Sequence, residues 1–418
     1  MEALKIGERV ILHSDMNCFY ASVEMMLHPE LRGKAVAVCG STETRHGIVL
    51  AKSEPAKKAG IKTGMVNWEA ERLCPGLILV QPHFEQYLKY SKLARSIYQR
   101  YTDFVEPYGM DECFLDVSGS ADMYGGGLEI AERIREAVKS ELGLTVSIGV
   151  SFNKVFAKLG SDMKKPDAVT VIDRENFKDK VWSLPASDLF FVGRATSKKL
   201  SRYGVHTIGE LAALSPEFLQ QVFGKNGLML WLYANGRDSA PVMNKDFVSP
   251  IKSIGHGITC TVDLQAEEEV WRVMLELSQD IGHKLRAHEC KASGVQIFVK
   301  DSSLNYKQFQ GKLAFSSSSP SDIAMKARAL FKDNYDWALP VRAVTVRAID
   351  LRGINEAEQI SIFSDAARTE RGEKLYDCVE EIRRRFGKHS VYSASLMGDI
   401  NMPAYRDHEL VMPGMMVR

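Results

Sequence analysis

A chain of 418 residues is too long for one ordinary hydrophobic core, since domains usually contain about 100 to 200 residues, and we expect three or four folded units. Its hydrophobic content of 45% and charged content of 26% are typical of a globular protein, and it has no apolar run of about 18 residues that could cross a bilayer. The net charge of +1 gives no bulk argument for a nucleic-acid partner, so any basic binding surface must be local.

The N-terminus and the cysteines favour a cytoplasmic protein. The first residues, MEALKIGER, lack a basic segment followed by an apolar one, so no secretory signal is predicted. The seven cysteines are an odd number without a C-x-x-C pair, which argues against a disulfide framework and against a zinc site. We therefore expect reduced, mostly buried thiols and a cytoplasmic location.

The first half of the chain alternates strand-like and helical patterns. Val10 to Leu12, KAVAVCG and LILVQP are short apolar runs, whereas CFLDVSG and LTVSIGVS alternate apolar and polar residues. Apolar residues at helical spacing in GLEIAERIREAVKSELG predict a helix that ends at Gly143. This order predicts a split βαβ, or ferredoxin-like, arrangement with helices on one face of a sheet.

From about Val181 the pattern changes to short helices separated by glycine turns, which predicts a compact helical module. PVMNKDFVSP, with a proline at each end and polar residues inside, is a predicted linker. A second α+β domain is expected from about Lys252 to Leu351, with strands at SGVQIFVK and VRAVTVRAIDL and a helix at EEEVWRVMLELSQDIGHKLRAH. SSSSPS is expected to be a hairpin loop, and a last helix is expected around KLYDCVEEIRRRFG.

Acidic residues occur at the ends of two predicted strands. Asp15 ends the first strand, and Asp111 and Glu112 begin the strand in GMDECFLD. If these strands are neighbours, three anions come together, and each pair about 4 Å apart costs around 4 kcal/mol at an effective dielectric constant of about 20. A divalent cation relieves this repulsion, and hard oxygen ligands suit Mg²⁺. Taken singly, each acidic residue could also be an ordinary turn, cap or surface residue.

Two lysines could supply positive charge to a phosphate at this place. Lys165 follows the helix expected in SFNKVFAKLGSDMKK and precedes a proline, and Lys57 lies in KSEPAKKAGIKTG. Such lysines would neutralise a triphosphate as point charges. Either one could equally be a surface lysine of a helix.

Three segments, HSDMNCFYASVE, YGMDECFLDVSG and SIGVSFNKVFAKLGSDMKKPDAVTVI, resemble in order and spacing the signature motifs of the Y-family, or translesion, DNA polymerases. The resemblance covers about residues 5 to 365. Within the family it is closest to the bacterial DNA polymerase IV group, with polymerase V catalytic-subunit features such as Asn17 and Tyr20.

The resemblance implies a multidomain, right-hand α+β fold with a ferredoxin-like palm, small fingers, a helical thumb and an α+β little finger. The expected boundaries are 1–26 and 83–180 for the palm, 27–82 for the fingers, 181–240 for the thumb, 241–250 for the linker, 251–352 for the little finger and 353–418 for a C-terminal tail.

It also implies the roles of residues around the nucleotide. Asp15, Asp111 and Glu112 would bind two Mg²⁺ ions together with the backbone carbonyl of Met16, and Tyr20 would be a steric gate that clashes with a ribose 2′-hydroxyl. The other expected nucleotide contacts are Cys18, Phe19, Lys57, Lys165, Ile48 and Gly64. Ile48 and Gly64 would lie over the nascent base pair and leave room for distorted bases.

Two motifs depart from the family pattern, at three positions. Glu54 and Lys57 stand where the family usually has a Tyr-x-x-Arg pair, which removes one triphosphate contact and weakens the geometry of the other. Gly109 stands where the family usually has serine. Neither change affects an expected metal ligand.

Candidate DNA contacts lie in the two later domains. FVGRATSKKL resembles a helix-hairpin-helix in which Gly193 and Arg194 offer backbone N–H groups to a DNA phosphate, although Phe191 replaces the usual first glycine. A generic helix turn is the alternative. Lys252 and Ser253, before GHGITCTVDL, are expected to contact the DNA backbone independently of sequence.

QISIF resembles the bacterial sliding-clamp-binding peptide. The resemblance implies clamp contacts by Gln359, Ile360, Ile362 and Phe363. An edge strand or ordinary packing of the tail would also fit this apolar island.

These features predict a monomeric, template-directed DNA polymerase of the translesion class. It would add dNTPs to a primer 3′-hydroxyl by two-metal phosphoryl transfer, with low fidelity and no proofreading, while tethered to the sliding clamp. Two alternatives are a nucleotidyl cyclase, which would have no use for DNA-binding domains, and a clamp-tethered DNA-binding protein without catalysis. The intact carboxylates argue against the second alternative.

Overall fold

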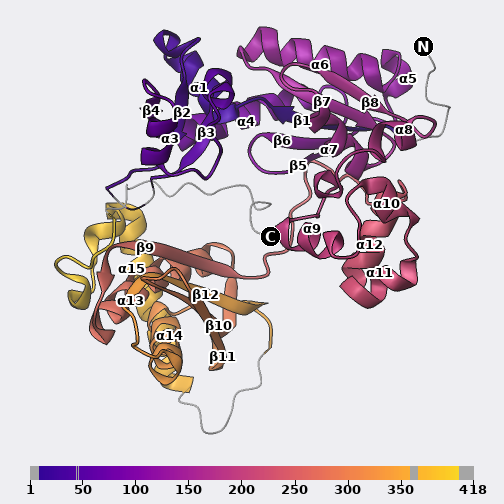
Figure 1. Cartoon of the computed structure of the whole chain (residues 1–418). Helices are drawn as coiled ribbons and strands as arrows, with labels where there is room; N and C mark the ends of the chain where they lie inside the picture. Colours follow the sequence, from indigo (N-terminus) through magenta and orange to yellow (C-terminus); the bar gives the residue numbers. More distant parts are fainter. Residues whose placement is uncertain (1–8, 44, 46, 358–365, 404–418) are drawn as a thin grey trace. The chain divides into compact units, whose positions relative to one another are not determined.

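The structure, a computed structural model, describes residues 9–43, 45, 47–357 and 366–403 and divides into two compact units (Figure 1). Of these residues, 9–40 and 48–248 form unit 1, and the others form unit 2. Among the described residues, unit 1 contains two large hydrophobic clusters and a smaller one, and unit 2 contains one large cluster. Among the described helices, none has the length and apolar character that a bilayer span requires.

A five-stranded sheet in the order β5-β6-β1-β7-β8 lies at the centre of unit 1. Its strands are β1 (Ile11–Met16), β5 (Val105–Pro107), β6 (Glu112–Asp116), β7 (Val146–Ser151) and β8 (Val169–Ile172). Its main helices are α4 (Phe84–Tyr98), α6 (Gly127–Leu142) and α7 (Lys154–Met163), with the short α5 (Ala121–Tyr124) before α6. The helix α6 ends at Gly143 in the left-handed conformation, as predicted.

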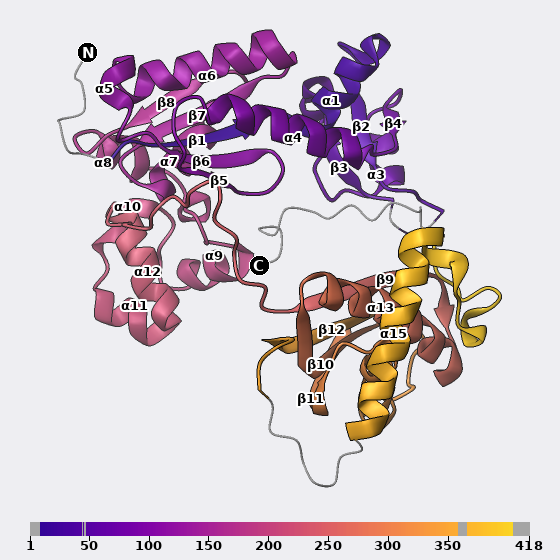
Figure 2. The same ribbon diagram turned by 180° about the vertical axis from the view of Figure 1, so that it is seen from behind.

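This sheet is covered by helices on both faces, whereas the sequence pattern predicted helices on one face only. The helix α6 packs closely on one face, because a Cβ on its Gly127 would lie 3.0 Å from Val150 of β7. The helix α7 packs on the other face, since a Cβ on Gly149 would lie 1.9 Å from the carbonyl oxygen of Ala157. Figures 1 and 2 show α6 and α7 on opposite sides of the sheet. All residues of β7 are consequently buried, despite the alternation of its sequence.

Two smaller parts complete unit 1. The first is a three-stranded sheet, β3-β2-β4, with short helices. Its elements are α1 (Phe19–Leu27), β2 (Val36–Cys39), β3 (Val49–Lys52), α2 (Glu54–Lys58), α3 (Asn67–Leu73) and β4 (Ile78–Val80). The second is the expected helical module, formed by α8 (Phe177–Val181), α9 (Arg194–Ser201), α10 (Ile208–Ala213), α11 (Pro216–Phe223) and α12 (Lys225–Ala234).

The predicted linker, residues 241–250, is fastened to unit 1 at its beginning. Val242 is buried in a small cluster with Phe114. The backbone N–H of Met243 donates to the carboxylate of Glu106 at 2.8 Å. The beginning of the predicted linker therefore packs against the five-stranded sheet, and its later residues lead on to unit 2.

A four-stranded antiparallel sheet in the order β11-β10-β12-β9 forms the centre of unit 2. Its elements are β9 (Ile254–Leu264), α13 (Glu267–Ala287), β10 (Cys290–Asp301), β11 (Tyr306–Ser317), α14 (Pro320–Asn334) and β12 (Val341–Gly353). The prediction for SSSSPS was wrong, because this segment joins β11 to α14. Ser319 is the N-cap of α14, and Pro320 lies in the first turn of this helix. A proline is tolerated there because the backbone N–H groups of the first turn have no partner within the helix.

The C-terminal part of unit 2 begins with α15 (Ala366–Phe386), which lies beside α13 in Figure 2 and contains the last predicted helix. Ion pairs join the two elements, among them Arg286–Asp377 at 3.1 Å and His283–Glu380 at 2.5 Å. Further along, the chain returns to the sheet, where the backbone N–H of Thr261 on the edge strand β9 donates to the carbonyl of Asn401 at 2.9 Å.

Candidate active site

Two of the three candidate carboxylates, Asp15 and Glu112, lie on adjacent strands of the five-stranded sheet, and Asp111 directly precedes the second of these strands. The antiparallel register of β1 and β6 pairs Asp15 with Glu112, so the predicted pairing of these strands is confirmed. The backbone N–H of Met16 donates to the carbonyl of Asp111 at 3.0 Å, which brings the third carboxylate to the same place. Asp15 is only 8% exposed, so little water reaches these charges.

The crowding of these anions acts most clearly on Asp111. Burial, followed by the charges of Asp15 and Glu112, raises its pKa to about 7. Burial would also raise the pKa of Glu112, but bonds and charges from His13 and Lys158 outweigh it and lower that pKa to about 2. The raised pKa of Asp111 shows that its negative charge is unfavourable beside Asp15 and Glu112. A cation bound near the three carboxylates would therefore be stabilised.

Lysines and a histidine supply part of that charge. Lys165 Nζ donates to Asp15 Oδ2 at 2.7 Å, and Lys158 Nζ donates to Glu112 Oε2 at 2.5 Å. His13 Nε2 lies 3.2 Å from the same oxygen of Glu112. Sequence reasoning named Lys165 but missed Lys158 and His13. The period of two in HSD places His13 on the same face of β1 as Asp15 and could have revealed it.

Within the described ranges of the chain, no group of three or more His, Cys, Asp or Glu side chains is arranged to hold a metal ion. Asp15 on β1 and Glu112 on β6 are neighbours, with Asp111 just before β6, but the three side chains are not grouped as metal ligands in this arrangement. Two of them are paired with ammonium groups instead.

The aromatic pair Phe19 and Tyr20 begins α1, directly after β1. Cys18 before them has a left-handed backbone with φ 49°, which turns the chain from strand to helix. Phe19 is buried, whereas the partly exposed ring of Tyr20 stacks on Tyr87 of α4 with centroids 4.3 Å apart. Burial and the charge of Asp111 raise the pKa of Tyr20 to about 12, so the phenol is neutral and lies within electrostatic reach of the carboxylates.

The remaining nucleotide candidates lie in the part with the three-stranded sheet. Glu54 joins two of them, because its Oε1 lies 3.4 Å from Lys57 Nζ and 3.4 Å from Cys18 Sγ. Ile48 is 40% exposed. Gly64 has φ +83° and no atom within 4 Å of the place where a Cβ would lie, so open space adjoins it.

The thumb candidates lie at the start of α9. Gly193 is the N-cap residue, and Arg194 is the first residue of the helix. Phe191, which replaces the expected glycine, takes φ 68° in the left-handed region that glycine enters easily. The backbone therefore keeps a glycine-like turn at this position.

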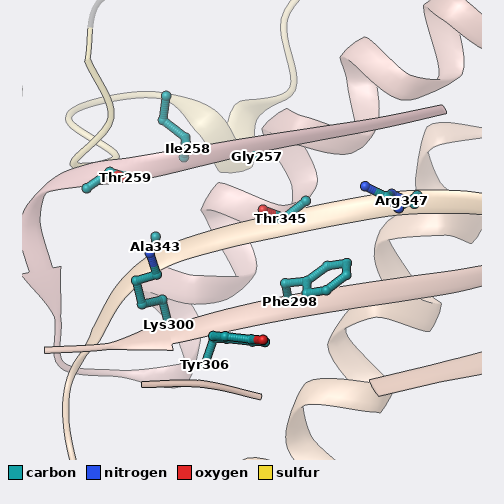
Figure 3. Close-up of a pocket in the computed structure, with 9 residues that line it drawn as sticks. All are labelled: Gly257, Ile258, Thr259, Phe298, Lys300, Tyr306, Ala343, Thr345 and Arg347. Atoms are coloured by element: carbon teal, nitrogen blue, oxygen red, sulfur yellow. The ribbon is translucent and has the colours of Figure 1, made fainter. Parts of the chain in front are cut away.

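A second candidate surface lies on the sheet of unit 2. Lys252 and Ser253 directly precede β9, and Lys252 is exposed. Figure 3 shows a pocket on one face of this sheet, lined by Gly257, Ile258, Thr259, Phe298, Lys300, Tyr306, Ala343, Thr345 and Arg347. The guanidinium of Arg347 lies 5.5 Å from the ring centroid of Phe298. Cations interleaved with aromatic rings suit a nucleic-acid strand.

Sequence reasoning missed this surface, although the period of two in SGVQIFVK and VRAVTVRAIDL could have shown it. The proposed clamp contacts Gln359, Ile360, Ile362 and Phe363 lie outside the described residues.

Comparison with protein families supports one assignment along most of the chain. Residues 14–162 match the impB/mucB/samB family, and residues 251–362 match the C-terminal domain of that family. Residues 187–238 match the thumb domain of DNA polymerase-iota.

Individual relatives agree with the family matches. DNA polymerase IV of Acetivibrio thermocellus is 51% identical over 94% of this chain and 98% of its own length. DNA polymerase IV of Pelotomaculum thermopropionicum is 37% identical over 92% of this chain and 94% of its own length. DNA polymerase IV 1 of Bacillus subtilis is 36% identical over 91% of each chain.

A solved structure of a Y-family DNA polymerase chimera of Dbh and Dpo4 has a similar fold. Its TM-score is 0.74 at 22% identity, and the match covers 82% of this chain and 99% of that one. The chain therefore belongs to the Y-family of DNA polymerases and is a DNA-directed DNA polymerase with the multidomain right-hand fold.

Proposed function

We propose that the protein extends a primer 3′-hydroxyl with dNTPs by two-metal phosphoryl transfer, with low fidelity and without proofreading of its own. The observation that carries this proposal is the pairing of Asp15 with Glu112 on β1 and β6, beside Asp111 and the ring of Tyr20. The palm would contain the five-stranded sheet, with the domain boundaries expected from the sequence.

Asp15, Asp111 and Glu112, with the carbonyl of Met16, would hold two Mg²⁺ ions. The donor set fits, because it consists of hard oxygen atoms and because burial and two neighbouring anions raise the pKa of Asp111 to about 7. When bound, the ions would supply activation of the attacking hydroxyl and stabilisation of the leaving pyrophosphate.

Side chains of the protein would bind and orient the nucleotide. Lys165 and Lys57 would contact its phosphates, and each now has a carboxylate partner, Asp15 at 2.7 Å and Glu54 at 3.4 Å. Glu54 places a negative charge beside the triphosphate position, which would weaken nucleotide binding.

Sugar and base would be read by shape. The ring of Tyr20, supported by Phe19 and close to Cys18, would exclude a 2′-hydroxyl by a clash rather than by an attraction. The exposed Ile48 and the open space at Gly64 would tolerate distorted base pairs, which favours synthesis on damaged templates with low fidelity.

DNA would be bound by sequence-independent contacts. Gly193 and Arg194 at the start of α9 would contact one stretch of backbone, and Lys252 with Ser253 would contact another. Gln359, Ile360, Ile362 and Phe363 would bind the bacterial sliding clamp. The protein would act as a monomer in the cytoplasm.

Primer extension tests the proposal. With primed template, Mg²⁺ and dNTPs, we expect extension on an undamaged template and past at least one lesion in a panel of damaged templates. If no extension occurs, the alternative of a DNA-binding protein without catalysis is favoured. The ion pairs of Asp15 with Lys165 and of Glu112 with Lys158 would then serve only to stabilise the fold.

The gate has a separate test. Tyr20→Ala should lower the preference for dNTPs over rNTPs by about a hundredfold or more, because the filled space that excludes the 2′-hydroxyl is lost. The measurement is the ratio of kcat/KM for a dNTP and its matching rNTP. An unchanged ratio would place the gate elsewhere.

The clamp contact is tested by replacing Gln359, Ile362 and Phe363 with alanine. Synthesis without clamp should be unaffected, whereas stimulation by added bacterial clamp should disappear, because the anchoring side chains are missing. Equal stimulation of both forms would rule out this tether.

A further inference from the structure

A buried carboxylate lies behind the proposed sugar gate in unit 1. Glu24 is 0% exposed and lies on α1, one helical turn after Tyr20. A buried ionised carboxylate is stable only when hydrogen-bond donors surround it. Two donors come from the start of α4: the hydroxyl of Tyr87, and His83 Nδ1 at 3.0 and 3.1 Å from the two carboxylate oxygens.

The direction of these hydrogen bonds follows from the chemistry of the groups. An ionised carboxylate only accepts, so the Tyr87 hydroxyl donates and His83 carries its proton on Nδ1. Burial and the bond to Glu24 raise the pKa of Tyr87, so its hydroxyl keeps the donated proton. The ring of Tyr87 is thereby fixed at both ends, by the backbone of α4 and by Glu24.

The same ring supports the gate. The rings of Tyr20 and Tyr87 are nearly parallel, with an angle of 9° and centroids 4.3 Å apart. Phe84 meets the ring of Tyr20 edge-on at 6.0 Å, and Phe19 lies 5.6 Å away. One face of the gate is therefore covered by Tyr87, and a movement of Tyr87 would give the gate room to withdraw.

We infer that Glu24 and His83 are positioning residues that hold Tyr20 in place through Tyr87 and so set the discrimination between deoxyribonucleotides and ribonucleotides. The inference rests on the proposed role of Tyr20 as the gate. Neither residue needs to touch the nucleotide, because both act through the ring of Tyr87. Glu24, Tyr87 and Tyr20 form a closed path of contacts between α1 and α4.

The test compares sugar discrimination in matched variants. For each variant, kcat/KM is measured for a dNTP and for the matching rNTP in one preparation, so that the ratio does not depend on the active fraction. Tyr87→Phe and Glu24→Gln each weaken a hydrogen bond to a charged group, and we expect the ratio to fall by about tenfold. The fall should come from better use of the rNTP, mainly through a lower KM.

His83→Ala provides a variant that the fold tolerates, since this side chain is 51% exposed and does not cap α4. It should lower the ratio by about threefold, because Glu24 keeps its bond to Tyr87. Tyr90→Phe is the control. It removes a hydroxyl from the same helix outside this cluster and should leave the ratio at the wild-type value.

Tyr20→Ala separates the two possible failures. If that variant keeps the wild-type ratio, the proposed gate itself is wrong. If it loses discrimination while Tyr87→Phe, Glu24→Gln and His83→Ala keep the wild-type ratio, only the positioning inference is overturned. In the Tyr20→Ala background, Tyr87→Phe should cause no further loss, and a further tenfold loss would also overturn the inference.

Discussion

The two large sheets of the molecule bury their strands differently. In unit 1, β1 and β7 are buried along their whole length, because α6 and α7 cover opposite faces. In unit 2, β12 alternates: Val344 and Val346 lie in the core, while Thr345 and Arg347 line the pocket on the other face.

This difference separates two kinds of chemistry. In the covered sheet each charge is expensive, so the carboxylates perturb one another and the pKa of Asp111 rises to about 7. In the open sheet Lys300 and Arg347 meet the solvent, where they can attract a polyanion and where salt screens them. A covered sheet suits a small reacting group, and an open sheet suits a long, variable ligand.

The largest effect is expected from the covered sheet. Asp111→Ala should reduce primer extension by about a thousandfold or more, since one of the three proposed carboxylate ligands is lost, while the Kd for primed DNA stays within about tenfold. Extension assays and DNA titration measure the two effects. Asp122→Ala, on the short α5, is the control, and retained extension by Asp111→Ala would remove the proposed role of this carboxylate.

A second prediction concerns the packing of α7 on the five-stranded sheet of unit 1. Gly149→Ala places a Cβ 1.9 Å from the carbonyl oxygen of Ala157, so α7 must move away from β7. We expect the free energy of unfolding of unit 1 to fall by about 3 kcal/mol, measured by chemical denaturation.

Gly119→Ala is the matched control for that change, because no atom lies within 4 Å of its Cβ position. Equal stability of the two variants would mean that α7 does not depend on this close approach.

The smallest effect is expected on the open sheet. If Lys300 and Arg347 each contact a phosphate, changing both to alanine should weaken DNA binding by about tenfold and reduce the slope of log K against log salt by about two. DNA titrations at several salt concentrations measure both quantities. Lys332→Ala, an exposed change on α14, should leave the slope unaltered, and an unchanged slope in the double variant would exclude this face from DNA binding.

The sequence predicted those parts of the fold that have local signals. A short apolar run indicated β1, the alternation of apolar and polar residues indicated β6, and helical spacing with a final glycine indicated α6. The acidic residues at the strand ends led to the pairing of Asp15 with Glu112. The packing of a helix on the second face of the five-stranded sheet was not predicted. It depends on the close approach of α7 to Gly149, and such a contact leaves no periodic pattern in the sequence. The serine run at the end of β11 was predicted to be a hairpin loop because serine and proline are common both in turns and at the start of a helix, where Ser319 and Pro320 lie.

The residues around the carboxylates show the same limit. Lys165 was found through a motif, but Lys158 contacts Glu112 and Tyr87 contacts Glu24 across long stretches of chain, so no spacing within a motif indicates them. Such partners come together only in the folded structure, where a buried carboxylate needs a nearby donor because an unpaired buried charge is destabilising.

The return of the chain to β9 has a consequence for the behaviour of the protein in concentrated solution. An edge strand exposes backbone donors and acceptors that can recruit a strand of another molecule. The bond from Thr261 to Asn401 occupies one such donor of β9. A chain shortened before Asn401 would therefore leave part of this border open to intermolecular β-pairing, so the segment at Asn401 also protects the protein against aggregation.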